Sequence, residues 1–477
     1  AAPMVVWCLL AALVAARAAG GRAAAAALES RKAKASRRPP LAWNTWCTSS
    51  TCFQEHEEKK LHDVCSEEEI KTIAEAIITN GMRDIGYRYI NLDDCWCATE
   101  RDHRGDLVGD RERFPNGIAA LSQWLHNRGF LFGIYLSAGV TTCSRGGRAA
   151  DIPGSYGNYV RDANRMNEWN VDYVKLDWCG HVLPNGTKLQ QSVQTVQFNE
   201  ALRAANSEIW FNFHCDEGEP GFQGHAWCIQ SGDSFRVWHD HHDTWPSTYS
   251  IIKNAWMNND VMKQGGPHHW NDGDFLMTGG AGCGKKTPGL RCPGMTDDEY
   301  RTEMALWCVS SSAIVVSTDV RQMSDLQKQI LLSKDALAVN QLFVGDSGRY
   351  IGAVGDQLQL FVKQLRSGSS NGNYTMWAVV VLNEAATATT AAVTVDFAKV
   401  NAAFANATAV VFDVWAETAV VRRASFTSAG PIAPHGTSFV ILSQTDATTT
   451  TTTWQPLPPQ HRPWLHDYDA LLLPAVQ

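Results

Sequence analysis

The chain lacks features that mark several classes of protein. Its 41 lysine and arginine residues face 49 aspartate and glutamate residues, so the formal net charge of −8 leaves no basic excess for nucleic acid. Beyond residue 16 no segment has the roughly 18 apolar residues that a membrane-spanning helix needs. No cysteine lies in a paired CxxC pattern, which disfavours a structural zinc site. We therefore expect no nucleic-acid partner and no membrane span.

What the chain does have is enough apolar material for a large folded protein. Its 477 residues are 44% apolar and include 18 tryptophans, which fits one large domain plus a smaller one. A tryptophan-rich, mildly acidic composition favours an enzyme that acts on carbohydrates or other small molecules.

The beginning of the sequence and its cysteines indicate export. Residues 4–16 form a short apolar run followed by small residues, so residues 1–27 are predicted to be a signal peptide with an alanine-rich end, and residues 28–39 a basic linker. N-glycosylation sequons begin at Asn185, Asn373 and Asn406. Of 13 cysteines, Cys8 lies in the signal segment, which leaves an even number for disulfides. We expect a secretory-pathway protein that is extracellular or enters a compartment resembling a lysosome or vacuole.

Apolar strands alternate with amphipathic helices between residues 40 and 345, the predicted catalytic domain. One helix is expected over residues 66–79, where Ser66 and Glu69 form a capping box and apolar residues recur on one face. The candidate strands are residues 41–46, 87–94, 130–135, 172–177, 208–213, 234–240, 268–272 and 313–318. Eight strands with intervening helices predict an α/β fold, a (β/α)8 TIM barrel. A doubly wound sheet is the alternative that strand counting leaves open.

The pattern of apolar residues in the sequence changes after residue 345. Runs that alternate with period two, separated by turn residues, predict an antiparallel β-sandwich over residues 346–445. Residues 446–477 begin with a threonine run and continue with a proline-rich segment, so we expect a low-complexity, disordered tail.

Acidic residues close several of the candidate strands. Active sites of barrels lie at the C-terminal ends of the strands, so these are the positions to examine. A single acid there is more often a solvated loop residue or a helix cap, but several acids on one rim favour a site. The candidates are Asp93, Asp94, Asp177, Asp240, Asp272 and Asp274.

Residues 234–245, SFRVWHDHHDTW, contain three histidines and two aspartates in five consecutive positions. A metal site and an acid–base site are both open interpretations. Side chains alternate along a strand, so Arg236 and Asp240 are expected on one side and His241 on the other, which weakens the metal interpretation. By the same alternation Lys175 shares a face with Asp177, where its charge would keep that carboxylate ionised.

The chain resembles glycoside hydrolase family 27, which contains α-galactosidases and α-N-acetylgalactosaminidases. The resemblance covers about residues 37–345 and the sandwich that follows the barrel. It rests on blocks that occur in the family's order and spacing: WNTW, INLDDCW, RFPNGIAAL, FGIYLSAGVTTC, GSYGNYVRDA, WNVDYVKLDWC, GDSFRVWHD, GPHHWNDGD and TDVRQMS.

The resemblance implies a retaining glycosidase that needs no cofactor or metal and removes terminal α-D-galactose. Asp177 matches the family's nucleophile and Asp240 its general acid/base. The positions that match the family's contacts to the sugar are Trp46, Asp93, Asp94, Tyr135, Lys175, Asp216, Arg236 and Asp274. The resemblance also implies the disulfides Cys47–Cys95 and Cys143–Cys179, and spacing suggests Cys52–Cys65, Cys215–Cys228 and Cys283–Cys292.

Other functions fit the same residues. The chemistry of the family also serves α-N-acetylgalactosamine and β-L-arabinopyranose, and a galactose-binding protein without activity is the alternative from another class. Asp216 favours galactose, because an acid there accepts a hydrogen bond from a 2-hydroxyl and leaves no place for an acetamide. The oligomeric state stays open, with a homodimer as one option.

Overall fold

The computed structural model describes residues 38–46, 65–143, 151–215, 226–280, 294–368, 375–447, 450–451 and 453–472. The predicted signal peptide, most of the basic linker, Asp216 and the sequon at Asn373 lie outside the described residues. So do Cys47, Cys52, Cys283 and Cys292.

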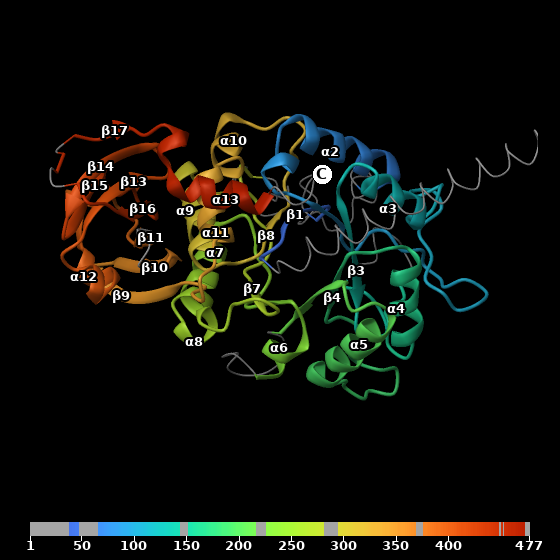
Figure 1. Cartoon of the computed structure of the whole chain (residues 1–477). Helices are drawn as coiled ribbons and strands as arrows, with labels where there is room; N and C mark the ends of the chain where they lie inside the picture. The colour runs from blue at the N-terminus through green and yellow to red at the C-terminus, as the bar shows by residue number, and fades with distance from the viewer. Residues whose placement is uncertain are drawn as a thin grey trace, which may run out of the picture.

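Eight parallel strands form the sheet of the first domain, in the order β7-β6-β5-β4-β3-β2-β1-β8 (Figure 1). They are β1 (Leu41–Asn44), β2 (Tyr89–Leu92), β3 (Leu131–Ser137), β4 (Tyr173–Asp177), β5 (Trp210–His214), β6 (Ser234–Arg236), β7 (Trp270–Asp272) and β8 (Ile314–Val316). Leu276, just beyond β7, pairs in parallel with Val316 of β8 and brings the two ends of the sheet together. The predicted TIM barrel is confirmed, and this sequential order rules out the doubly wound alternative.

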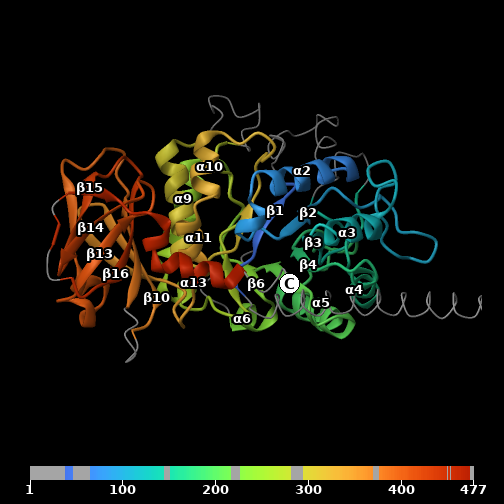
Figure 2. The same cartoon turned by 45° about the horizontal axis from the view of Figure 1, so that its top comes forward.

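Helices cover the outside of this barrel (Figure 2). Ser66 Oγ caps the first of these helices by accepting a hydrogen bond from the amide of Glu69. The Glu69 carboxylate pairs with Arg321 instead of returning to Ser66, so only one of the two hydrogen bonds of the predicted capping box forms. The helices of this domain are α2 (Glu67–Thr79), α3 (Ile118–His126), α4 (Tyr159–Glu168), α5 (Gln191–Ala205), α6 (Ala226–Ser231), α7 (Trp245–Ile251), α8 (Asn259–Met262), α9 (Asp297–Val309), α10 (Asp325–Leu331) and α11 (Lys334–Gln341).

Alternation along the strands separates two apolar layers. On β4, Val174 and Leu176 belong to the large core shared with the helices, whereas Tyr173 belongs to a smaller cluster with Tyr89 and Trp210 of other strands. This smaller cluster fills the barrel interior, so the polar side chains that follow it along each strand lie at the carboxyl-terminal mouth.

The second domain is a β-sandwich that lies beside the barrel (Figure 1). A seven-stranded antiparallel sheet faces a two-stranded one. The strands are β9 (Arg349–Gly355), β10 (Leu358–Arg366), β11 (Met376–Asn383), β12 (Ala392–Asp396), β13 (Thr408–Asp413), β14 (Thr418–Arg423), β15 (Ser425–Pro431), β16 (Thr437–Gln444) and β17 (Gln455–Pro456), with the short helix α12 (Phe397–Val400) between β12 and β13. Phe361, Met376 and Phe439 of this sheet share one core with the barrel, so the domains are packed together.

The prediction of a disordered tail is wrong for the last described residues. Pro463–Leu472 form helix α13, which returns from the sandwich to the barrel (Figure 2). Trp464 is fully buried, its Nε1 donates to Asp335 of α11 at 2.6 Å, and its ring packs on Phe412 at 5.0 Å. Tyr468 donates to the carbonyl of Ile85 at 2.5 Å. The composition of this segment did not predict a helix, because the order comes from a few buried side chains such as Trp464 and Tyr468.

We expect Trp464→Ala to destabilise the protein by about 3–5 kcal/mol, because it removes a fully buried indole and leaves a cavity between the domains. Thermal unfolding followed by circular dichroism measures the effect. His466→Ala, an exposed position on the same helix, is the matched control and should lie within about 0.5 kcal/mol of the parent. Equal unfolding temperatures for the two variants would show that α13 does not tie the domains together.

Three disulfides are present among the described residues: Cys65–Cys95, Cys143–Cys179 and Cys215–Cys228. The predictions of Cys143–Cys179 and Cys215–Cys228 are confirmed. Cys47–Cys95 and Cys52–Cys65 are wrong, because Cys65 at the start of α2 and Cys95 after β2 meet with their Cα atoms 6.2 Å apart. Disulfides indicate an oxidising compartment.

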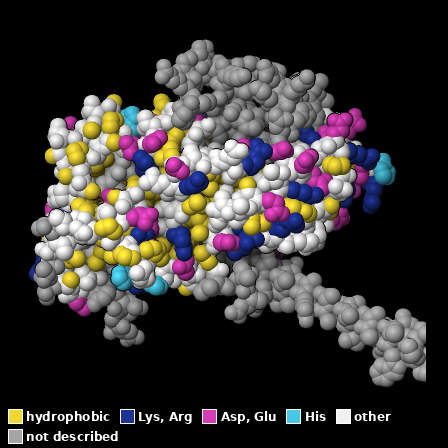
Figure 3. All heavy atoms as spheres, turned by 90° about the horizontal axis from the view of Figure 1, so that it is seen from above, with side chains coloured by type: hydrophobic (Ala, Val, Ile, Leu, Met, Phe, Trp, Pro, Cys, Tyr) yellow, Lys and Arg dark blue, Asp and Glu magenta, His cyan; other side chains and the backbone are white. Residues whose placement is uncertain are grey.

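One face of the molecule shows how its charges are distributed (Figure 3). Lysine and arginine side chains lie next to aspartate and glutamate side chains over the barrel, and hydrophobic side chains form several groups, mostly over the sandwich and the middle of this face. Within the described part of the chain, no helix is both long and apolar enough to span a bilayer.

Candidate active site

The structure brings most of the predicted site residues to one rim of the barrel. Asp177 ends β4, Arg236 ends β6 and Asp272 ends β7, and Asp93 follows β2 directly. Asp93, Asp94, Lys175, Arg236, Asp272 and Asp274 are all buried. The side chain of Asp240 is 66% exposed, so this carboxylate faces the solvent side of the rim.

Asp177 lies between two donors. Its Oδ1 accepts from the amide of Trp178 at 2.8 Å and lies 3.3 Å from Nε2 of His214. Burial alone would raise the pKa of Asp177, but the charges of His214 and Lys175 outweigh it and hold that pKa below its ordinary value. The surroundings of Asp177 therefore favour its ionised form. The disulfide Cys143–Cys179 ties the loops after β3 and β4 beside it.

Arg236 contacts several acids of the site. Its Nη2 lies 3.0 Å from Oδ1 of Asp240 and 3.1 Å from Oδ2 of Asp274, and its Nη1 lies 3.0 Å from Nε2 of His214. The predicted proximity of Arg236 and Asp240 is present, but β6 ends at Arg236 and a bend of the following loop makes the contact. Partial desolvation by the surrounding rim opposes ionisation of Asp240, yet the charge of Arg236 lowers its pKa well below the ordinary value.

Lys175 pairs directly with Asp93 rather than with Asp177. Its Nζ donates to Asp93 Oδ2 at 3.0 Å, and Asn44 donates to the same oxygen at 3.1 Å. Lys175 acts on Asp177 through its charge and not through a hydrogen bond. The ammonium also lies 4.6 Å from the ring centre of Phe275, which helps to hold the charge in place.

The loop after β7 aims Asp274 into the site. Asp274 adopts a φ of 77°, a conformation that is costly for a residue with a side chain and that is found where the surroundings fix the backbone. Its amide donates to Asp272 Oδ1 at 2.8 Å. Gly273 lies against two tryptophans, where a Cβ would come within 2.7 Å of Trp256 and Trp307, so only glycine fits here.

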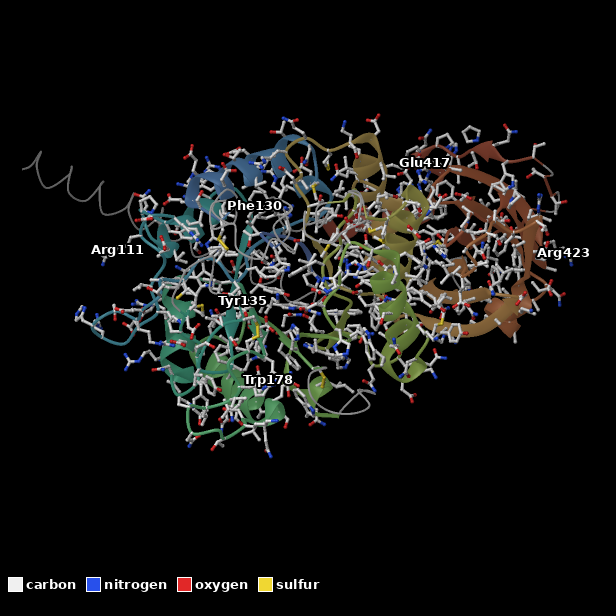
Figure 4. All side chains as sticks on the ribbon, turned by 180° about the vertical axis from the view of Figure 1, so that it is seen from behind. Arg111, Phe130, Tyr135, Trp178, Glu417 and Arg423 are labelled. Atoms are coloured by element: carbon white, nitrogen blue, oxygen red, sulfur yellow. A yellow bond between two sulfur atoms is a disulfide. The ribbon has the colours of Figure 1, made fainter. Side chains whose placement is uncertain are left out.

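Trp46, Asp94 and Tyr135 also lie at this end of the barrel. Tyr135 is buried, and its hydroxyl accepts from the amide of Cys143 at 3.4 Å (Figure 4). Burial raises the pKa of Tyr135, so it remains a neutral phenol. Trp46 is half-buried against the interior cluster. Asp216 follows Cys215 after β5 and lies outside the described residues.

The histidines around Asp240 do not converge on a point. His241 is buried, with Nδ1 2.7 Å from the carbonyl of Phe275 and Nε2 2.8 Å from the hydroxyl of Thr248, so both ring nitrogens have protein partners. Burial lowers the pKa of His241 to about 4. Among the described residues, one group with metal-ligand spacing is Cys143, Asp177 and Cys179, but its sulfurs form a disulfide and offer no thiolate.

Sequence reasoning missed His214 as a site residue. It ends β5, 3% exposed, beside the nucleophile candidate. The signal was present in the sequence, because a polar residue closes this apolar strand as aspartates close the others. His214 was not among the candidates because only acidic residues were considered at the strand ends.

The comparisons with known proteins agree on the family. A family model described as Alpha galactosidase A matches residues 38–342, and a model of the alpha galactosidase C-terminal beta sandwich domain matches residues 355–442. The chain belongs to the α-galactosidase family, glycoside hydrolase family 27. As a member of this family it is a glycoside hydrolase.

Relatives with different activities are about equally similar to the chain. The α-galactosidase A of Cellvibrio japonicus is 31% identical over 358 residues, which are 73% of this chain and 77% of the relative. The α-N-acetylgalactosaminidase of Gallus gallus is 32% identical over 340 residues, 70% of this chain and 78% of the relative. The structure of α-galactosidase I from Mortierella vinacea superposes with a TM-score of 0.69 at 24% identity, covering 87% of this chain and 99% of that one, and supports the fold.

Proposed function

We propose that the chain is a retaining exo-glycosidase that hydrolyses terminal α-D-galactosides of oligosaccharides, glycoconjugates or galactolipids. The observation that carries this proposal is the linkage of two carboxylates at one barrel rim. Asp177 contacts His214, His214 contacts Arg236, and Arg236 contacts Asp240. Two carboxylates at one site can perform double displacement at an anomeric carbon, one as the nucleophile and the other as general acid and base.

In the proposed first step, Asp177 attacks the anomeric carbon and forms a covalent galactosyl ester. Asp240 gives its proton to the departing glycosidic oxygen. In the second step Asp240 takes a proton from water, which attacks the same carbon and releases Asp177 as a carboxylate. The lowered pKa of Asp177 suits a nucleophile, because the attacking group must be ionised.

The remaining buried polar residues are proposed to hold the sugar. Asp93, Asp94, Lys175, Arg236 and Asp274 offer carboxylates and cations that can bind hydroxyl groups. Trp46 and Tyr135 supply aromatic surface for the apolar face of galactose. Because most of these groups are already fixed by hydrogen bonds or ion pairs to each other, the site is preorganised for a small polar ring.

Preference at the sugar's 2-position is proposed to favour a hydroxyl over an acetamide. Asp216 is the residue assigned to this contact, and burying its carboxylate against an acetamide methyl would leave it unpaired, at a cost of about 1–3 kcal/mol or more. We expect kcat/KM for 4-nitrophenyl α-D-galactoside to exceed that for the α-N-acetylgalactosaminide by about ten- to a hundredfold or better.

A panel of nitrophenyl α- and β-glycosides, with EDTA added in parallel, tests both the proposed function and this preference. The α-galactoside should be the best substrate, the β-L-arabinopyranoside should be poorer, and chelation should leave the rates unchanged. Comparable kcat/KM on the galactoside and the N-acetylgalactosaminide would contradict the role of Asp216. Absence of hydrolysis across the panel would favour the galactose-binding alternative.

We further propose that the enzyme matures in the secretory pathway. The predicted signal segment, the disulfides and the sequons support this destination. Asn185 and Asn406 are both exposed, as glycan attachment requires. Localisation of the enzyme in cells distinguishes an extracellular destination from a compartment that resembles a lysosome or vacuole. Analytical sedimentation measures whether the protein forms a homodimer.

A further inference from the structure

His214 lies inside the cluster of catalytic candidates, at the end of the strand between β4 and β6. Its Nε2 is 3.3 Å from Oδ1 of Asp177 and 3.0 Å from Nη1 of Arg236. The other terminal nitrogen of Arg236 is 3.0 Å from Asp240. One imidazole nitrogen thus connects the nucleophile candidate with the arginine that holds the acid/base candidate.

Nε2 of His214 cannot form hydrogen bonds with Asp177 and with Arg236 at the same time. A guanidinium only donates hydrogen bonds and a carboxylate only accepts them. When Nε2 carries a hydrogen it donates to Asp177, and when it carries a lone pair it accepts from Arg236 and repels the carboxylate. An ionised Asp177 favours the first state.

We propose that His214 is a positioning residue of this enzyme, which donates from Nε2 to Oδ1 of Asp177 and so directs the other carboxylate oxygen at the anomeric carbon. The inference rests on the proposed function. The amide of Trp178 donates to the same Oδ1 at 2.8 Å, so two donors fix one oxygen and Oδ2 is left for attack. Arg236 also contacts Asp240 and Asp274, so this arginine connects His214 with both acids.

The charged groups around His214 determine what its removal does. Asp177 faces it from β4, Arg236 from β6, and Asp240 from the loop after β6, while Lys175 acts on Asp177 from within β4. Burial raises the pKa of Asp177, and His214 is the largest influence that lowers it. Without His214 the nucleophile therefore becomes protonated at a higher pH, and activity should be lost earlier as the pH falls.

The test compares His214→Met, which removes the donor at similar volume, with His214→Gln, whose amide can donate from a similar place. For His214→Met we expect kcat/KM on 4-nitrophenyl α-galactoside to fall about ten- to a hundredfold, with the acidic limb of its pH profile shifted to higher pH. His214→Gln should recover much of the rate. His214→Asn, whose shorter amide does not reach Asp177, should resemble the methionine variant and replaces it if that variant does not fold.

Several results would overturn the inference. A methionine variant within about threefold of the parent, with an unshifted acidic limb, shows that Asp177 does not depend on His214. Equal losses in the glutamine and methionine variants that track their unfolding temperatures show a purely structural role. If the parent enzyme itself hydrolyses no glycoside, the proposed function fails instead, so the two failures are distinguishable.

Discussion

Asp177→Asn is expected to lower kcat on 4-nitrophenyl α-galactoside by about ten-thousandfold or more while the protein stays folded and still binds galactose. An amide is too weak a nucleophile to form the ester, yet it has nearly the same shape and can still accept from the amide of Trp178. Steady-state rates measure the loss, and the melting temperature with and without galactose measures the retained fold and binding.

The matched control is Asp260→Asn, the same exchange at an exposed position in the first turn of α8. It should leave kcat unchanged. An Asp177→Asn enzyme with more than about one-tenth of the parent rate would show that another group attacks the sugar.

Asp240→Ala is expected to have an effect that depends on the leaving group. Substrates with sugar or alkyl aglycones need a proton on the departing oxygen and should lose about a hundred- to ten-thousandfold in kcat/KM. Nitrophenyl substrates leave without that proton and should lose far less. Added azide should restore turnover on activated substrates, because it attacks the galactosyl ester without a general base. Equal losses on both kinds of substrate, with no effect of azide, would contradict the assignment.

The proposed mechanism requires Asp240 to be protonated before the sugar is attacked. Arg236 lowers the pKa of Asp240, whereas a general acid must hold a proton before attack. We infer that a bound sugar draws Arg236 away from Asp240 and allows its pKa to rise. The side chain of Asp240 can move for this exchange, because it is 66% exposed and its ion pair with Arg236 lies at the solvent side of the rim.

Much of the site was predictable because the barrel imposes its geometry on the sequence. Apolar runs mark the strands, and the residues that close parallel strands must meet at one rim, so Asp93, Asp177 and Asp274 could be brought together without knowing any loop. The roles of Asp177 and Asp240 came from the resemblance to a family, since the same acids at a rim are compatible with several kinds of chemistry.

Contacts between side chains could not be predicted in the same way. The sequence placed Lys175 of β4 on the same face as Asp177, but its ammonium reaches past β3 to Asp93 after β2. That contact depends on the spacing of β2 and β4, which the sequence does not specify. Cys95 joins Cys65 because α2 begins beside the loop after β2, which no spacing rule specifies. The position of His214 after an apolar strand indicated the rim, but its contacts could not be predicted because its partners come from two other strands.

The most direct test of the account is the identification of the residue that carries the covalent intermediate. The enzyme is incubated with an activated fluorinated galactoside, digested, and the modified peptide is sequenced by mass spectrometry. The account predicts a single galactosyl adduct on Asp177, formed by the parent enzyme and absent from Asp177→Asn. An adduct on another carboxylate, or inactivation without any covalent adduct, would contradict it.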